Sequence, residues 1–178
     1  MILLRNKDIM KKTLPILIAI IITLSACSPT SVSPKEIVDR LCDAEIGLPS
    51  GTVYSTDALA KSPGFLSPQL LAVTYGIPLD FDGIESASVR LSGVRHPTEF
   101  AVFLCKDANA AEDTSLFCRQ RISSLLKNAS SSAPLCNMSV EDYNRYLSGA
   151  FVAVSGRYVA LIISSDPSEA RRAFIKAL

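Results

Sequence analysis

Helix starts stand out in the pattern of polar and apolar positions that follows residue 32. Ser33, Ser67 and Asp166 each directly precede a proline and a stretch with helical periodicity. A capping residue followed by proline is typical of a helix start. The side-chain oxygen of the first residue accepts a hydrogen bond from a free backbone amide, and proline in the first turn sacrifices no backbone hydrogen bond. A fourth and longest helix is predicted over residues 109–127, with Asn109 at its start. The helix after Ser67 is expected to end at Gly76, since a helix C-cap favours glycine.

The helix over residues 109–127 is predicted to be amphipathic. At about 100° per residue, one side collects small and apolar side chains and the opposite side collects charged and polar ones. Cys118 lies near the middle of the apolar side. We expect this side to face the core, and it consists of Ala111, Ser115, Cys118, Ile122, Leu125 and Leu126.

Four stretches rich in β-branched and aromatic residues predict strands that pair as two hairpins. The first hairpin joins residues 87–92 to residues 100–105. The second joins residues 151–154 to residues 158–163 through the turn Ser155-Gly156-Arg157. In contrast, residues 47–64 have no clear period, so we expect an irregular connection there.

The order of the elements predicts the fold class. Two short helices come first, and the chain then reads strand, strand, helix twice, with a further helical turn expected near residues 139–143. Antiparallel hairpins with helices packed on the sheet make a two-layer α+β domain. The strands that begin at Phe100 and Tyr158 are apolar on both faces, so we expect them at the centre of the sheet, with the N-terminal helices on its second face.

Composition and charge limit the class of partner. The chain has 178 residues, enough for one domain, and 18 Lys+Arg stand against 17 Asp+Glu. A chain this close to neutral lacks the excess of basic side chains that binding to phosphate backbones requires. Nucleic acid is therefore not an expected partner.

The N-terminal region has the pattern of an export signal. Basic residues between Arg5 and Lys12 precede an uncharged apolar run over residues 13–26. This run is shorter than the roughly 20 apolar residues that span a bilayer, so a permanent transmembrane helix is the weaker interpretation. The run ends in Leu24-Ser25-Ala26-Cys27, which resembles the bacterial lipobox.

The lipobox resemblance implies cleavage between Ala26 and Cys27 and a diacylglyceryl group on the Cys27 thiol. An ordinary secretory signal in which a cysteine happens to follow Ala26 is the alternative. Residues 28–33 are polar and suit a tether between the lipid and a folded domain. We therefore predict a signal peptide over residues 1–26, a lipidated cysteine with linker over residues 27–33, and one domain over residues 34–178. The predicted location is the outer face of the cell membrane, with the membrane as a partner through the lipid on Cys27.

Three stretches resemble a family of small Gram-positive lipoproteins known only as a domain of unknown function. They are residues 71–77 (LAVTYGI), residues 99–107 (EFAVFLCKD) and residues 156–164 (GRYVALIIS). The resemblance extends from about Leu66 to Leu178 and includes the lipobox. It implies a lipid-anchored extracytoplasmic protein, and it brings no reaction, ligand or catalytic residue.

The chain departs from that family pattern in having four cysteines in the domain. After export an even number of cysteines favours disulfides, and the sequence alone leaves all three connectivities open. The first hypothesis is that Cys118 pairs with Cys136 and Cys42 with Cys105. A single disulfide, or free buried thiols that act as small apolar side chains, are the alternatives. A zinc site is disfavoured, because no two cysteines have the spacing that builds half a tetrahedral site.

Other candidate chemistry is sparse. His96 precedes a proline and is expected in an exposed turn, and Asp80, Asp82 and Glu85 are expected to form a solvated turn without the spacing of a calcium loop. No glycine-rich phosphate loop is present, so the sequence predicts no cofactor.

These observations favour a non-enzymatic binding domain at the membrane surface, with an envelope protein or a small ligand as its partner. A small envelope enzyme is one alternative, and it requires His96 or the cysteines to gather with a carboxylate in one cleft. An accessory solute-binding subunit of a transporter is another, and it requires a deep ligand cavity.

Overall fold

The structure is a computed structural model, and it describes residues 31–93 and 95–178. The folded domain is the compact unit Val32–Leu178. The predicted signal peptide, Ala26 and Cys27 lie outside the described residues. Within the described part of the chain, no helix combines the length and the apolar character needed to cross a membrane.

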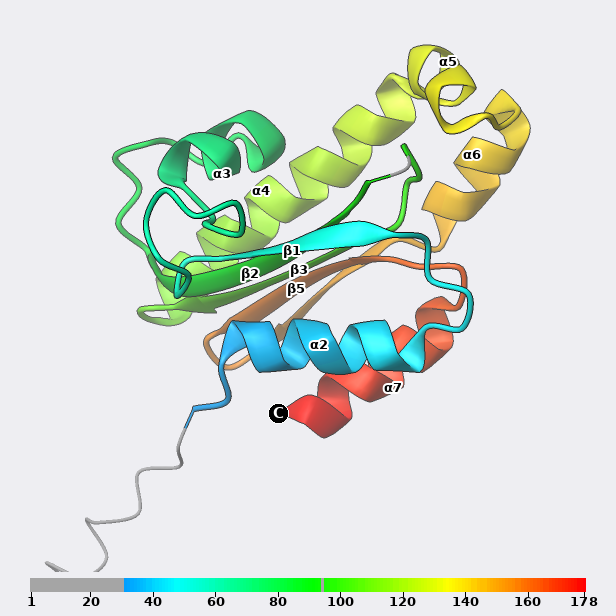
Figure 1. The fold of residues 1–178 in the computed structure, drawn as a ribbon. Helices are drawn as coiled ribbons and strands as arrows, with labels where there is room; N and C mark the ends of the chain where they lie inside the picture. The colour runs from blue at the N-terminus through cyan, green and yellow to red at the C-terminus, as the bar shows by residue number, and fades with distance from the viewer. Residues whose placement is uncertain (1–30, 94) are drawn as a thin grey trace, which may run out of the picture. The chain divides into compact units, whose positions relative to one another are not determined.

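The domain is built on one antiparallel sheet of five strands in the order β1-β2-β3-β5-β4 (Figure 1). Every residue of β3 is buried, and β5 is buried beyond its first residue. Both strands predicted to be central are interior strands: β3 is the middle strand of the sheet, and β5 lies next to it, as β2 does on the other side. The strand bounds are β1 Gly51–Ser55, β2 Ile84–Ser92, β3 Glu99–Cys105, β4 Phe151–Ser155 and β5 Tyr158–Ile163.

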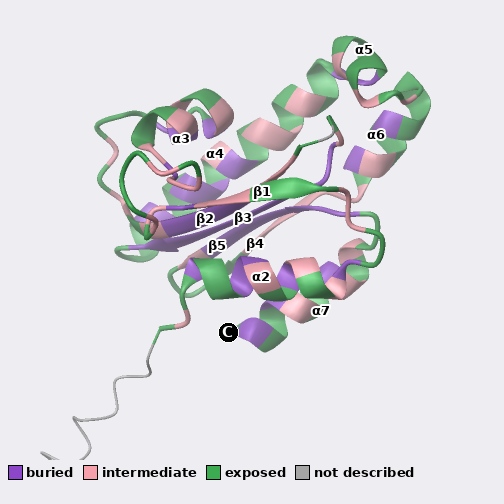
Figure 2. Cartoon of the chain, viewed as in Figure 1, coloured by how far each residue is buried: buried purple, intermediate pink, exposed green. Residues whose placement is uncertain are grey.

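Helices cover both faces of this sheet (Figures 1 and 2). Along β3, Ala101 and Phe103 belong to one core cluster, whereas Phe100 and Val102 belong to the other, because successive side chains of a strand point to opposite faces. The α+β class with an antiparallel sheet is confirmed. The first face carries α3 (Pro68–Tyr75), α4 (Ala108–Lys127) and α6 (Val140–Ser148), and the second carries α2 (Pro34–Ala44) and α7 (Pro167–Ala177).

The N-terminal helices are thus divided between the faces. Helix α2 packs against α7 on the second face as expected, but α3 packs against α4 on the first. The expectation that both would lie on the second face was wrong for α3. Its Leu71 and Tyr75 belong to the same core cluster as Phe103, which faces α4.

The predicted caps form as expected at three helices. The side chains of Ser33, Ser67 and Asp166 accept hydrogen bonds from the amides three residues later, and Gly76 ends α3 with φ 69°. The predicted start of the long helix at Asn109 was wrong. Asp107 caps it instead, by accepting a hydrogen bond of 2.8 Å from the Ala110 amide, so Asn109 lies inside the helix.

Two further elements differ from the prediction. Strand β1 lies inside the stretch expected to be irregular, where it pairs with β2 from Gly51 opposite Ser92 to Ser55 opposite Ser88. Its partner is more than 30 residues away in sequence, so no local period signals it. Helix α6 is nine residues long rather than one turn, and it follows the short α5 (Ala129–Ser132) and η1 (Pro134–Cys136).

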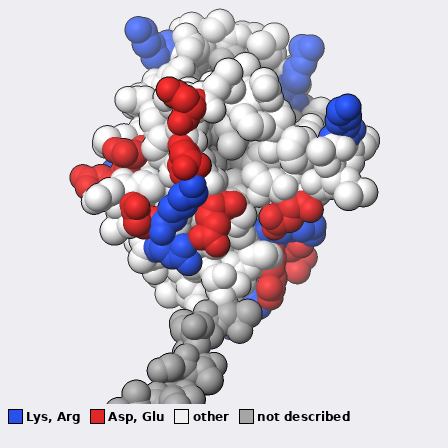
Figure 3. Space-filling model, turned by 90° about the vertical axis from the view of Figure 1, so that its left-hand side faces the viewer, with Lys and Arg blue, Asp and Glu red and all other residues white. Residues whose placement is uncertain are grey.

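The two ends of the sheet are named here by their position relative to Val32, where the chain enters the domain. At the tether end, the Tyr158 hydroxyl at the start of β5 donates a hydrogen bond of 2.8 Å to the carbonyl of Val32. Figure 3 looks at this end and shows acidic and basic side chains interleaved on its surface. The opposite end, where β3 begins at Glu99 and β5 ends at Ile163, is called the cleft end after the cleft described below.

Candidate functional site

Buried polar residues gather at the cleft end of the sheet. Arg90, Thr98 and Glu99 lie in or next to β2 and β3, and each is less than 5% exposed. Glu45 and Ser164 are also buried there, and the Glu45 carboxylate accepts hydrogen bonds from the Ser164 and Ser165 hydroxyls. Burying charged groups costs free energy unless they are paired, so this end is the best candidate for a functional site.

The central charge pair is formed by Glu99 and Arg121. Glu99 begins β3, Arg121 projects from α4, and Arg121 Nη2 donates to Glu99 Oε2 at 3.0 Å. The Glu99 side chain is 5% exposed and that of Arg121 is 25% exposed. Burial, reinforced by the neighbouring Glu99 carboxylate, raises the pKa of the Tyr75 hydroxyl far above its usual value. Among the described residues, the Tyr75 hydroxyl and Glu99 Oε1 are both buried without a hydrogen-bond partner, so Arg121 is the group that pairs with this carboxylate.

A second polar chain connects the loop before β3 to α6. The Thr98 amide donates to His96 Nδ1 at 3.3 Å, and Thr98 Oγ1 lies 2.9 Å from the same nitrogen and 2.5 Å from the Tyr146 hydroxyl. Because Nδ1 accepts from the amide, the proton of the neutral ring is assigned to Nε2. The ring also packs edge-on against Tyr146, with centroids 5.2 Å apart.

The charge state of His96 follows from its surroundings. Burial lowers its pKa below 6.5, and the positive charge of Arg90 lowers it further, while Glu45 acts in the opposite direction. The imidazole is therefore neutral at neutral pH, and it offers an N–H donor.

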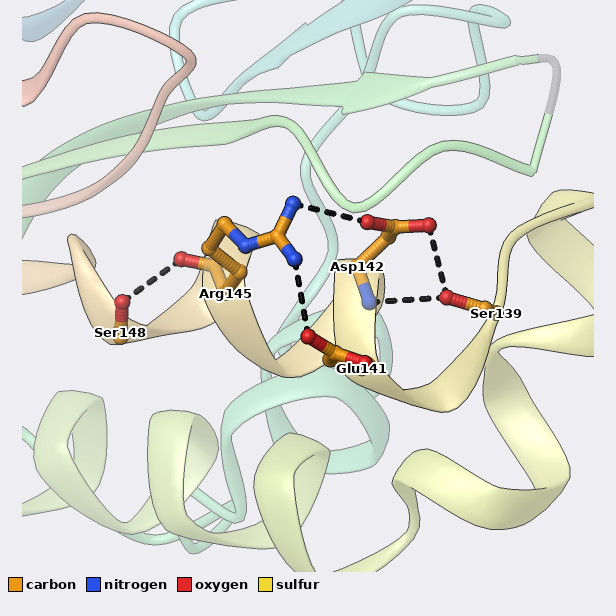
Figure 4. A network of polar contacts seen from close by, with 5 residues as sticks. All are labelled: Ser139, Glu141, Asp142, Arg145 and Ser148. Carbon is orange, nitrogen blue, oxygen red and sulfur yellow. Dashed lines mark hydrogen bonds and ion pairs between the residues drawn. The ribbon is translucent and has the colours of Figure 1, made fainter.

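Helix α6 is fixed by its own polar contacts, which are drawn in Figure 4. Ser139 caps the helix by accepting a hydrogen bond of 3.0 Å from the Asp142 amide, and its hydroxyl donates to Asp142 Oδ2 at 2.7 Å. Arg145 pairs with Asp142 at 2.9 Å and with Glu141 at 3.1 Å. These contacts stabilise the helix that carries Tyr143 and Tyr146 into the site.

A cleft of about 360 Å³ opens between α4, α6 and the loop before β3. Its lining combines charged, polar and apolar side chains. A second hollow of about 400 Å³ reaches Tyr146, Ser164 and Ser165. The residues of the cleft that carry its chemistry are Arg95, His96, Glu99, Arg121, Cys136 and Tyr143.

The four domain cysteines are free thiols in the structure. Cys42 packs against the core cluster of one face and Cys105 belongs to the cluster of the other, so the sheet separates the two. Cys118 and Cys136 contact the same cluster as Cys105. Neither bridge expected from the sequence is formed here, and the arrangement corresponds to the alternative of thiols that act as small apolar side chains.

The environment of these thiols keeps them protonated. Burial raises the pKa of Cys42 to about 11 and raises the pKa of Cys105, Cys118 and Cys136 as well. Cys105 Sγ donates to Thr114 Oγ1 at 3.5 Å. A thiol with a raised pKa is a poor nucleophile, because the thiolate is the reactive form.

The sequence-based expectation for His96 was wrong. It is half-buried and lines the same cleft as Glu99 and Cys136, rather than standing in an exposed turn. The sequence carried no signal of this, because Tyr146 is 48 positions from Thr98. The acidic turn, in contrast, is solvated as expected: Asp82 pairs with Lys106 at 2.6 Å and Glu85 with Arg157 at 2.6 Å, on the surface of the tether end.

Charged and polar groups line the cleft beside apolar side chains. Cys136 and His96 line it together, yet no hydrogen bond joins them among the contacts of the described residues. No group of three or more His, Cys, Asp or Glu side chains within the described ranges is placed to hold a metal ion. The charged and polar lining includes the guanidinium groups of Arg95 and Arg121, the Glu99 carboxylate and the His96 imidazole.

Comparison with known proteins adds no family to this geometry. No family model matches the chain, and no curated protein or solved structure matches it.

Proposed function

We propose that this protein is a lipid-anchored, extracytoplasmic binding domain that recognises an envelope protein or a small ligand through the cleft at the end of its sheet. The observation that carries the proposal is the separation of the two ends. The chain enters the domain at Val32, at the tether end, whereas the polar cleft opens beside Glu99, at the other end of β3. A domain attached by Cys27 would thus present its cleft away from the membrane.

The short tether strengthens this orientation. Five peptide units separate Cys27 from Val32, so even a fully extended chain reaches only about 17 Å. Helix α2 has 11 residues, which corresponds to about 16 Å, and it runs from the tether end toward the cleft end. The tether holds one end of the domain near the lipid surface and leaves the other end free for a partner.

The properties of the cleft favour binding over covalent catalysis. The pKa of Cys136 is raised by burial, and His96 Nδ1 is occupied by Thr98. Nucleophilic catalysis needs an activated thiolate or hydroxyl beside a free base. A fixed set of hydrogen-bond donors beside an apolar wall is instead what a recognition site needs.

The test is intact mass spectrometry of the protein extracted from membranes, for the unchanged chain and for Cys27→Ala. We expect a diacylglyceryl group on Cys27 of the unchanged chain, and an unprocessed precursor without lipid for Cys27→Ala. Cys42→Ala is the matched control, because it removes a cysteine of the domain and leaves the lipobox intact. Lipid that persists in Cys27→Ala, or an unchanged chain without any lipid, would overturn the proposal.

A further inference from the structure

The charge balance of the cleft identifies the class of ligand. Two guanidinium groups, those of Arg95 and Arg121, line it together with one carboxylate, that of Glu99. Glu99 already pairs with Arg121 through one oxygen, and its other oxygen is buried. His96 is neutral for the reasons given above. Among the described residues of the cleft, one positive charge is therefore left without a partner.

The geometry of Arg121 leaves part of its guanidinium for a ligand. Nη2 bonds to Glu99, and Nε is buried without a hydrogen bond within the described residues. The side chain is nevertheless 25% exposed and lines the cleft, and its Nη1 has no hydrogen bond to a side chain or carbonyl of the described residues. A carboxylate or phosphate is the natural acceptor for such a nitrogen, since charge-assisted hydrogen bonds are stronger than neutral ones.

Apolar side chains line the cleft close to these charges. Leu125 lies one turn along α4 from Arg121, and Leu135 of η1 is 58% exposed. Pro97 and Cys136 line the cleft as well. An inorganic anion would leave these apolar side chains in water, whereas an organic anion with an apolar body would cover them.

We propose that the cleft binds a small organic carboxylate, with its carboxylate at Arg95 and Arg121 and its apolar body against Leu125 and Leu135. This inference rests on the proposed function, because it names the ligand class of the same recognition site. The His96 Nε2–H and the Tyr143 hydroxyl supply further donors at the cleft. The volume of about 360 Å³ admits a molecule of the size of an acylated amino acid.

The test uses N-acetyl-leucine and its uncharged counterpart N-acetyl-leucinamide, titrated into the full-length protein in detergent micelles and followed by calorimetry. We expect N-acetyl-leucine to bind about tenfold more tightly than the amide, which is the effect of one charge-assisted hydrogen bond. Equal affinity for the two probes, or no binding of either, would overturn the inference.

Arg95→Asn is the matching variant. Arg95 is exposed and has φ 52°, a conformation that asparagine tolerates, so the domain is expected to keep its fold. The variant should bind N-acetyl-leucine about tenfold more weakly. Arg119→Gln is the control, since Arg119 is exposed on α4 and does not line the cleft. An Arg95→Asn protein that binds as tightly as the unchanged chain would also count against the inference.

The two proposals can fail separately. Lipid on Cys27 without binding of N-acetyl-leucine would support the lipid anchor and overturn the proposed ligand class. Binding of N-acetyl-leucine by a protein without lipid would support the ligand class and overturn the lipid anchor.

Discussion

The two ends of the sheet handle charge differently. At the tether end, Lys106 pairs with Asp82 and Arg157 with Glu85, and all four side chains are at least 43% exposed. At the cleft end, Glu99 and Arg121 form a pair in which the carboxylate is 5% exposed. Water solvates the first set of pairs, whereas the second depends on its protein partners.

The comparison shows that the buried charge pair at the cleft end is not explained by its contribution to stability. Exposed ion pairs contribute little and are easily replaced. A buried pair requires desolvation of both charges and is often no better than an apolar replacement. The domain nevertheless places a buried charge pair, a half-buried histidine and a tyrosine around one cleft, and this clustering is what the proposed recognition site would require.

The largest effect is expected from breaking the buried pair. Arg121→Leu leaves the Glu99 carboxylate buried without its partner, and we expect the free energy of unfolding to fall by about 3 kcal/mol. Urea unfolding followed by circular dichroism measures this. The double variant Glu99→Met with Arg121→Leu should recover part of the loss, because it removes both charges. Arg121→Leu as stable as the unchanged chain would mean that the pair is not buried as described.

A smaller, pH-dependent effect is expected at His96. Its pKa is lowered in the folded protein, mainly by burial and also by Arg90, while Glu45 opposes the shift. Below its ordinary value of 6.5 the unfolded chain therefore binds the proton more readily than the folded chain does. Stability should fall as the pH is lowered through this value, and the fall should level off once the folded protein is protonated as well.

Urea unfolding between about pH 7.5 and about pH 5 checks this, with His96→Gln as the comparison. The difference in stability between the two proteins should shift over this range in favour of His96→Gln at the acidic end. Parallel curves would show that His96 does not titrate differently in the folded protein.

The smallest effect is expected at the tether end. Lys106→Met removes the partner of Asp82, whose side chain is 91% exposed. We expect a change of at most about 0.5 kcal/mol in the free energy of unfolding, measured by the same urea titration. A loss as large as that of Arg121→Leu would erase the contrast between the two ends.

Local signals predicted much of the fold. Three of the four helix starts were found from a capping side chain and a proline, and the central strands were found from their apolar runs. The fourth start was misplaced because Asn109 and Asp107 are both capable caps and lie two residues apart. Strand β1 was missed because its stability comes from pairing with β2 and not from its own pattern.

The cleft could not be predicted in the same way. Its residues come from β3 and the loop before it, from α4, from α5 and η1, and from α6, and none of them carries a catalytic or binding motif. The pairing of the cysteines could not be predicted from local sequence either. The sequence indicated that they could pair, but alternation along β3 places Cys105 in a different core cluster from Cys42.

Local sequence was enough to predict three of the four helix caps, the interior strands β3 and β5 and the α+β class, because these depend on contacts within a few residues or on the period of a single segment. It also carries the prediction of a lipid on Cys27, which is a local motif. The tertiary structure alone decided the division of the helices between the two faces and the gathering of polar groups at one end. These depend on contacts between distant residues, such as the bonds that join Glu45 to Ser164 across 119 positions, and no local pattern encodes them.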